Sequence, residues 1–188
     1  MRKVAAWLFM TLDGVVESPE KWQADVMDDD MMGDIISQSD AEDAIFMGRV
    51  TYQDFAPFWP TSTAEPFASH INNTPKYVVS TTLDEVEWGN WDKPTLIKGN
   101  LGKEINKLKQ QSGKNIGVSG SPTLVRSLLR DNLLDELKLM IHPVIVGNGK
   151  RLFKEEGDLK KLQLVDSKVT SKGVVILTYQ PAKNESEK

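Results

Sequence analysis

The sequence predicts an α/β protein with a mostly parallel sheet, helices on both faces and antiparallel strands at the end of the chain. Short apolar runs alternate with segments of helical spacing through the first two-thirds, and strand-like segments dominate the remainder. That order is typical of parallel strands joined by helices, followed by an antiparallel hairpin. The 188 residues fit within one domain. We expect this domain to span residues 1–180, with a polar tail over 181–188.

Five strands are expected in the first two-thirds of the chain, and the first is an almost continuous apolar run, as in a strand buried on both faces. They are Val4–Leu12, Ala44–Met47, Lys76–Ser80, Thr95–Lys98 and Asn115–Val118. The intervening segments place apolar residues on one helical face, as Met31 and Ile35 do in the first of them. These helices are Asp28–Ser39, Arg49–Phe55, Phe67–Ile71, Leu101–Gln111 and Thr123–Leu129.

The last third of the chain alternates with the two-residue period of strands. Apolar and polar side chains alternate from Leu137 to His142. Two further runs, Leu162–Thr170 and Val174–Tyr179, flank the turn residues Lys172 and Gly173. We expect these two runs to close the sheet as an antiparallel hairpin.

Composition excludes several classes of protein. No apolar run approaches the ~20 residues that a membrane-spanning helix needs, and Met1–Thr11 lacks the small-residue cleavage site of a signal peptide. A net charge of −4 argues against a non-specific nucleic-acid binder. The chain has no cysteine and only two histidines, His70 and His142. We therefore expect a cytoplasmic protein with no metal centre, no membrane partner and no nucleic-acid partner.

Two junctions between a buried strand and a helix carry the functional signal. The first is Met47-Gly48-Arg49, and the second is Ser119-Gly120-Ser121-Pro122. A helix start exposes unpaired N–H groups and usually attracts a carboxylate. Here neither start has one, and Arg49 is the only Lys or Arg between Trp22 and Pro75.

An external anion would explain both junctions. A diphosphate accepts the free N–H groups, an arginine adds a fork of donors, and glycine lets the backbone approach closely. The alternative is that Gly48 and Gly120 are ordinary turn glycines and that Arg49 reaches into solvent. The residues alone leave the two interpretations nearly balanced.

At these junctions the sequence resembles a known group of reductases. Met47–Tyr52 resembles the Gly-Arg-x-Thr segment with which dihydrofolate reductases hold the pyrophosphate of NADPH. An ordered set of further motifs is similar to the reductase domain of the riboflavin-biosynthesis deaminase/reductase, the RibD C-terminal domain, from Met1 to Tyr179. The motifs are Thr11–Gly14, Val79-Ser80, Gly120–Leu124, Asp135–Leu137 and Pro143–Gly147.

The resemblance implies a dihydrofolate reductase-like three-layer α/β/α sandwich, bound NADP(H), hydride transfer to a small-molecule substrate, and a homodimer. Carried over by position, Gly48, Arg49 and Thr51 contact phosphates, and Ser80 lies near the adenosine 2′-phosphate with Thr81 beside it. The resemblance also implies that a helix start wraps the diphosphate, with the residues Gly120, Ser121, Pro122, Thr123 and Leu124. It also places Asp13 and Trp22 near the nicotinamide and the substrate.

Two positions depart from the family pattern. Ser119 stands where the pyrimidine reductase carries a glutamate facing its substrate, which puts the phosphoribosylaminopyrimidine substrate in question. Thr81 stands where close relatives often carry an arginine, which weakens the case for NADP over NAD.

Asp13 is the candidate to bind substrate or to relay a proton, because it follows an apolar strand whose burial would raise the pKa of the carboxyl group. A solvated turn carboxylate is the alternative. Trp22 either covers the nicotinamide or caps the core. Two functions follow: an NADPH-dependent reductase of a heterocyclic or imine substrate, or a non-catalytic NADP(H)-binding dimer that acts as a sensor.

Overall fold

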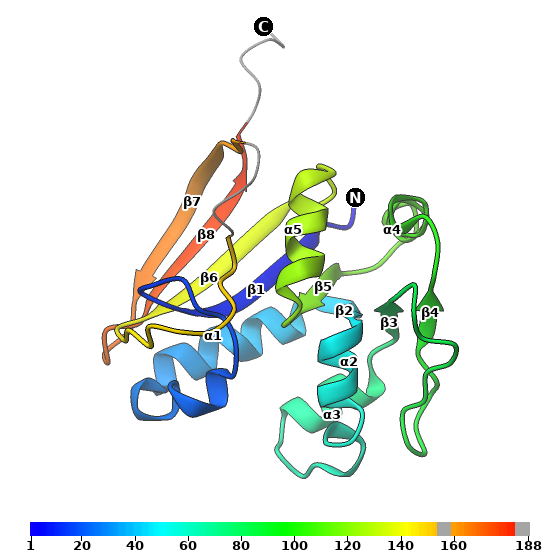
Figure 1. The fold of residues 1–188 in the computed structure, drawn as a ribbon, viewed down its shortest axis with the longest axis horizontal. Helices are drawn as coiled ribbons and strands as arrows, with labels where there is room; N and C mark the ends of the chain where they lie inside the picture. Colours follow the sequence, from blue (N-terminus) through cyan, green and yellow to red (C-terminus); the bar gives the residue numbers. More distant parts are fainter. Residues whose placement is uncertain (154–158, 183–188) are drawn as a thin grey trace, which may run out of the picture.

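A computed structural model describes residues 1–153 and 159–182 (Figure 1). Its eight strands are β1 (Val4–Thr11), β2 (Glu42–Gly48), β3 (Lys76–Val79), β4 (Thr95–Ile97), β5 (Asn115–Ser119), β6 (Glu136–His142), β7 (Leu162–Val169) and β8 (Val175–Pro181). Its five α-helices are α1 (Asp29–Asp40), α2 (Arg49–Phe55), α3 (Phe67–Asn73), α4 (Leu101–Lys109) and α5 (Pro122–Arg130). These counts refer to the described ranges.

One mixed sheet joins all of these strands. Its order is β4-β3-β2-β5-β1-β6-β8-β7, and every neighbouring pair from β4 to β6 is parallel. β8 pairs antiparallel with both β6 and β7. The predicted α/β class, with parallel strands first and an antiparallel hairpin last, is confirmed.

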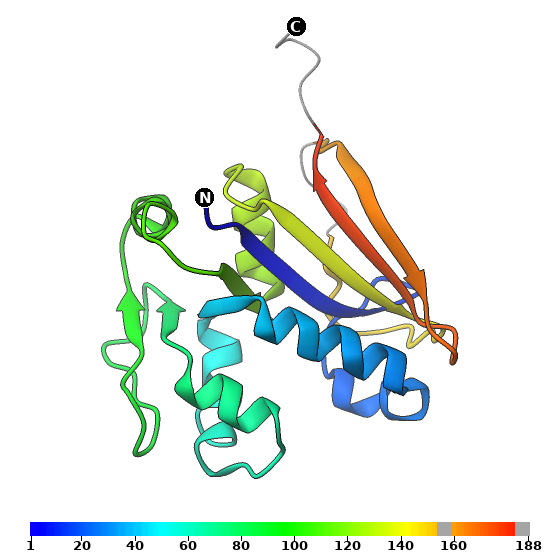
Figure 2. The same cartoon turned by 180° about the vertical axis from the view of Figure 1, so that it is seen from behind.

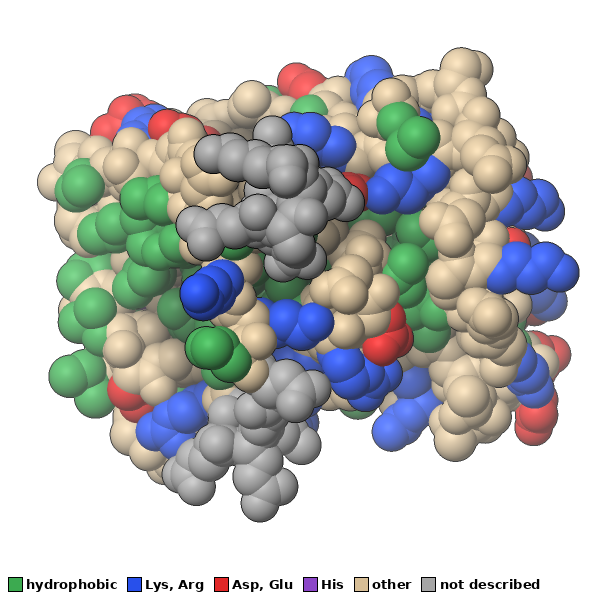
Figure 3. Space-filling model, turned by 90° about the horizontal axis from the view of Figure 1, so that it is seen from above, with side chains coloured by type: hydrophobic (Ala, Val, Ile, Leu, Met, Phe, Trp, Pro, Cys, Tyr) green, Lys and Arg blue, Asp and Glu red, His purple; other side chains and the backbone are tan. Residues whose placement is uncertain are grey.

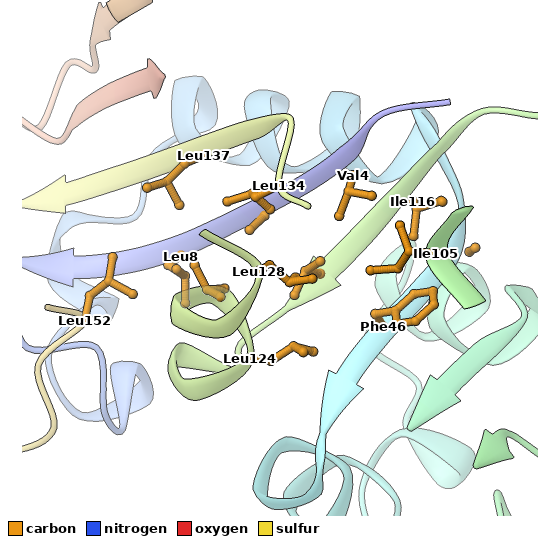
Figure 4. Packing of buried hydrophobic residues seen from close by; sticks show 14 of the residues in the cluster. Val4, Leu8, Phe46, Ile105, Ile116, Leu124, Leu128, Leu134, Leu137 and Leu152 are labelled. Carbon is orange, nitrogen blue, oxygen red and sulfur yellow. The ribbon is translucent and has the colours of Figure 1, made fainter. Parts of the chain in front are cut away.

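Helices cover both faces of the sheet, which gives the expected three layers. α4 and α5 pack on one face, where Ile105 and Leu128 join a core cluster with Leu8 and Phe46 of the sheet (Figure 4). α1 and α3 lie on the other face, nearest the viewer in Figure 2. There Met31 packs with residues of β6 and β8. Because β1 faces helices on both sides, its sequence is apolar almost throughout.

The structure differs from the expected elements mainly at their ends. β2 begins at Glu42 and carries a bulge between Glu42 and Ala44, so a charged residue enters a buried strand. β8 extends to Pro181, which pairs with Leu162, so the first residue of the predicted tail belongs to the sheet. Ala182 follows with a backbone bond to Lys161, and the last six residues of that tail, 183–188, lie outside the described residues. Three short 3-10 turns were not expected: Pro19–Lys21, Ala24–Val26 and Trp59–Thr61.

The parallel strands all end at the same edge of the sheet, and helices or loops start there. In open α/β sheets ligands bind at this edge. Both strand–glycine–helix junctions, Asp13 and His142 lie along it, at the ends of β2, β5, β1 and β6. In the ranges that the structure describes, no helix is long and apolar enough to cross a membrane.

Candidate cofactor and substrate site

The two glycine junctions lie side by side because β2 and β5 are adjacent parallel strands. The N–H of Gly48 donates to the hydroxyl oxygen of Ser121, at 2.7 Å. The hydroxyl oxygen of Thr51 lies 2.7 Å from the same Ser121 oxygen. Both hydroxyl groups are buried. The two junctions are therefore parts of one surface.

Each of the two junction glycines has little space beside it. A Cβ atom at Gly48 would lie 3.3 Å from the Ser121 hydroxyl oxygen. Gly120 has a φ of +62°, in the left-handed region, and a Cβ atom there would lie 3.2 Å from the Thr51 methyl group. The glycines therefore let the two turns approach each other closely and keep their backbones accessible.

Some hydrogen-bond donors at the two junctions are not used within the protein. The Ser121 oxygen accepts from Gly48, and one hydroxyl hydrogen forms the bond between Thr51 and Ser121. The two hydroxyl groups carry two hydrogens, so one is free to donate to a ligand. Ser121 is the N-cap of α5 and Pro122 its first residue, as expected, but among the described residues neither this cap nor Gly48 at α2 forms a side-chain capping bond. The first N–H groups of both helices can serve an anion.

Arg49 opens α2 with its guanidinium group exposed. Its Nη1 donates to Gln53 Oε1 at 3.0 Å on the same helix. Within residues 1–153 and 159–182 no carboxylate lies within ion-pair distance of Arg49. A positive charge at a helix start opposes the helix dipole. This guanidinium group is therefore available for a negatively charged ligand.

The other predicted cofactor residues flank these junctions. Ser80 follows β3, next to β2, and its buried hydroxyl accepts from the N–H groups of Thr82 and Leu83, both at 3.2 Å. Thr81 is exposed beside it. Pro122 and Thr123 form the first turn of α5. The side chain of Leu124 is buried in the core, so only its backbone can reach a ligand.

Asp13 lies at the end of β1, and its carboxylate already accepts hydrogen bonds from other parts of the chain. The Thr11 hydroxyl donates to Oδ1 at 2.6 Å, and the N–H of Gly147 donates to Oδ2 at 2.9 Å. The Thr11 bond is the largest effect that lowers the pKa of Asp13. The expectation that burial would raise this pKa is wrong, because hydrogen bonds to the charged form outweigh desolvation. Asp13 is an ionised anchor for the loop after β6.

Trp22, Ser119 and His142 lie on the face of the sheet that α1 covers. The Trp22 indole N–H donates to the Glu17 carbonyl at 3.0 Å, and its ring packs edge-on against His142 at 5.0 Å. Ser119 ends β5 opposite Trp7 of β1 and is buried. Trp22 thus covers the end of the sheet next to the junctions. In the described part of the chain, no group of three or more His, Asp or Glu side chains is placed to hold a metal ion.

Sequence reasoning did not predict that the segment 144–152 crosses the loop after β1. The N–H of Leu12 donates to the Val144 carbonyl, and the N–H of Leu152 donates to the Gly14 carbonyl. Arg126 of α5 donates to the carbonyl of Leu152 at 3.0 Å and so fastens the segment to the helix. The signal was weak, because backbone bonds depend little on residue type. Only Gly147 and Gly149, both with positive φ, mark the turn.

The family model of the RibD C-terminal domain matches residues 2–176. The protein YyaP of Bacillus subtilis is 31% identical over 185 residues, which cover 95% of this chain and 94% of YyaP.

Two solved structures have similar folds. A putative riboflavin biosynthesis protein from Shewanella sp. PV-4 superposes with a TM-score of 0.79 at 22% identity, over 97% of this chain and 100% of that one. A dihydrofolate reductase from Enterococcus faecalis, complexed with NADP(H), superposes with a TM-score of 0.64 at 14% identity, over 96% and 97%. The fold is therefore dihydrofolate reductase-like, and the chain belongs to the RibD C-terminal domain family.

Proposed function

We propose that the protein is an NADPH-dependent reductase that transfers a hydride to a small heterocyclic or imine substrate, related to 5-amino-6-(5-phosphoribosylamino)uracil reductases. One observation carries the proposal: the β2–α2 and β5–α5 junctions meet through Gly48, Thr51 and Ser121, and the Thr51–Ser121 pair keeps one hydroxyl hydrogen to donate. A similarly folded dihydrofolate reductase is complexed with NADP(H). The absence of cysteine suits the reducing cytoplasm.

The chain's own residues fit a dinucleotide diphosphate. Gly48 and Gly120 keep open the space that a Cβ atom would fill, and the first N–H groups of α5 point out of the helix end. Arg49 supplies a guanidinium group with no carboxylate partner in the described ranges, and the Thr51–Ser121 pair supplies one hydroxyl hydrogen. Ser80 and Thr81 follow the neighbouring strand β3, within the reach of an adenosine arm.

The reacting end of the cofactor belongs at β1 and β6. β1 lies two strands from β2 in the sheet, about 10 Å away at the usual strand spacing. A bound nicotinamide supplies the hydride. Trp22 packs over His142 at this end before a substrate binds, and Asp13 orients the loop after β6 through Val146 and Gly147. Because Asp13 is held ionised, the proton that completes the reduction comes from water or from another group.

A second function is favoured by one observation. Ser119 provides no charge for a substrate, and Asp13 is not poised as an acid. A domain that keeps the cofactor cradle without these groups could bind NADP(H) as a dimeric sensor and not turn over. The two proposals share the cofactor site and differ only at the substrate end.

The deciding experiment combines binding with turnover. Thermal-shift titrations with NADPH and NADH measure cofactor binding, since a ligand of the native state raises the melting temperature by mass action. NADPH oxidation is then followed at 340 nm against a panel of dihydropteridines and aminopyrimidines. We expect an NADPH-dependent shift and oxidation with at least one substrate. A shift without oxidation on any substrate supports the sensor, and no shift with either dinucleotide contradicts both proposals.

A homodimer is part of the proposal, with a second copy at the edge strand β7. Seven of the eight β7 residues are exposed, including Leu164, Val165 and Val169. Figure 3 shows apolar side chains gathered on its left, the side where β7 lies in Figure 1. β7 ends the sheet order, so its outer edge has no strand partner in the described ranges. An edge strand that pairs with its own copy across a two-fold axis extends the sheet and covers these side chains.

A further inference from the structure

His142 is buried at the end of β6 and serves no role in the diphosphate cradle. It has no exposed surface, and it pairs with Thr11 where β1 and β6 end together. Its ring lies between two aromatic rings, with centroids 5.7 Å from Phe9 and 5.0 Å from Trp22, both edge-on. The imidazole is therefore the polar group inside an aromatic enclosure at the proposed substrate end.

The hydrogen bonding of His142 fixes its tautomer. Nδ1 lies 2.9 Å from the Met140 carbonyl oxygen, which can only accept, so Nδ1 carries the hydrogen. Burial lowers the pKa of His142 and keeps the ring neutral. Nε2 is then an acceptor with a free lone pair. It is buried and has no partner in the described part of the molecule.

Two other buried polar atoms near this enclosure also lack partners. The described ranges hold four such atoms: Trp7 Nε1, Gln23 Oε1, His142 Nε2 and Oε2 of Glu42. Trp7 packs against Phe9 at 5.6 Å, and Gln23 follows Trp22 in the covering loop. Buried polar groups are almost always paired, so the unpaired Nε2 of His142 indicates a missing partner.

We propose that His142 is the specificity-determining residue of the substrate pocket and accepts a hydrogen bond from a ring N–H of a flat, uncharged heteroaromatic substrate. The ring takes the place of the Trp22 indole beside His142, and the loop that carries Trp22 swings outward to admit it. This inference rests on the proposed function and deepens it, because it names the substrate feature that the site reads. A substrate without the N–H leaves Nε2 unpaired and is rejected.

Trp22 is suited to such an exchange. It is only partly buried, and it lies between two short 3-10 turns, Pro19–Lys21 and Ala24–Val26. Its indole N–H is tied to the Glu17 carbonyl of the same loop, so the ring and the loop move together. An open hollow of about 160 Å³ lies outside Trp22, lined by Glu17, Lys21 and Asn148 among others. This hollow gives the loop space to change position.

The test uses lumazine, a fluorescent pteridine-2,4-dione with two ring N–H groups, and 1,3-dimethyllumazine, which has neither. Fluorescence titration of the full chain gives the affinity for each probe. We expect lumazine to bind about 5- to 150-fold more tightly, the effect of leaving one buried acceptor unpaired. Equal affinities, or no saturable binding of lumazine, overturn the proposal.

Two substitutions separate hydrogen bonding from the bulk of the methyl groups. His142→Asn can keep the bond to the Met140 carbonyl but has no acceptor at the Nε2 position, whereas His142→Gln can place an oxygen there. We expect the preference for lumazine to disappear in His142→Asn and to return in part in His142→Gln. A preference that persists in His142→Asn contradicts the assignment. If a variant fails to fold, the two probes on the unaltered protein still decide.

The result of the lumazine titrations can be distinguished from the result of the NADPH thermal shift. The diphosphate cradle is built from the two glycine junctions, which His142 does not contact, so NADPH should still raise the melting temperature of His142→Asn. NADPH binding without discrimination between the lumazines leaves the cofactor site intact and overturns the role of His142. Discrimination between them without NADPH binding overturns the reductase and keeps the pocket.

Discussion

The hydroxyl oxygens of Thr51 and Ser121 lie 2.7 Å apart, although the residues are separated by 70 positions in the chain. The contact joins the first turn of α2 to the start of α5, and the Gly48 N–H is tied into it. Two helix starts that sequence alone could only suspect of sharing a ligand are thus parts of one surface.

Arg49→Ala is expected to weaken NADPH binding without destabilising the fold. Loss of one charge-assisted phosphate contact costs about 1.5–3 kcal/mol, or roughly 10- to 150-fold in affinity. The side chain is exposed and, within the described ranges, bonds only to Gln53, so the melting temperature without ligand should be unchanged. Isothermal titration calorimetry measures the affinity. Arg130→Ala, an exposed arginine at the other end of α5, is the matched control and should bind NADPH normally; equal affinities for both variants would remove Arg49 from the site.

Gly120→Ala is expected to damage both stability and cofactor binding. Its φ of +62° costs an alanine about 1–2 kcal/mol, and the added methyl would lie 3.2 Å from Thr51. Gly173→Ala is the control, because Gly173 has a φ of +84° but nothing within 4 Å of the new atom. Both variants should lose melting temperature, and only Gly120→Ala should lose NADPH affinity. Parallel losses of affinity in the two variants would point to general destabilisation instead.

Asp28 is expected to make stability pH-dependent in acid. Its carboxylate caps α1 by accepting from the Met31 N–H, and this bond leads the effects that lower the pKa of Asp28 to about 2. It also accepts from the Lys172 N–H in the β7–β8 turn. A folded-state pKa below the unfolded value of about 3.9 means that the stabilisation is present above pH 4 and is lost as the pH falls towards 2.

Urea unfolding at pH 7, 4 and 3 tests this dependence. Asp28→Asn keeps an oxygen for the Met31 N–H but carries no charge, so its stability should fall less between pH 4 and 3 than that of the unaltered protein. The other carboxylates titrate equally in both proteins. The difference between their free energies of unfolding across these pH values therefore reports the contribution of the Asp28 charge. The same pH dependence in both would show that Asp28 contributes no charge-dependent stability.

Val165→Lys is expected to convert a dimer to a monomer. Val165 lies in β7 and is 45% exposed, and a lysine on an edge strand opposes pairing with a second copy. Phe58→Lys, at a position 55% exposed in the segment between α2 and Trp59–Thr61, is the control. Sedimentation equilibrium gives the mass of each variant. A monomeric unaltered protein, or a dimer in which Val165→Lys has no effect, would exclude this interface.

Local pattern was sufficient to predict most of the fold. Apolar runs and helical spacing located every strand and α-helix of the described ranges to within a few residues, because burial on one or two faces imposes those periods. The sequence did not predict the bulge at Glu42, since it depends on pairing with Asn115 of a distant strand. The sequence also did not predict the 3-10 turn at Trp59–Thr61, because the prolines in and before it indicated only that a helix ends.

The site was predictable where it depends on backbone shape and less so where it depends on distant partners. Gly48 and Gly120 could be recognised as places where a turn must stay open. The pKa of Asp13 could not be predicted, because two of the donors that lower it, Val146 and Gly147, lie more than 130 positions along the chain. His142 could be read only as a strand residue until its tautomer and its unpaired nitrogen were placed.

The joining of Gly48 to Ser121 has a consequence for synthesis of the protein. A nascent chain that has emerged only through β4 holds Arg49 and Thr51 but lacks the serine that completes the cradle. The dinucleotide that we propose therefore finds no complete cradle on the early strands. Its binding requires that translation has passed α5 and that β5 has paired with β2.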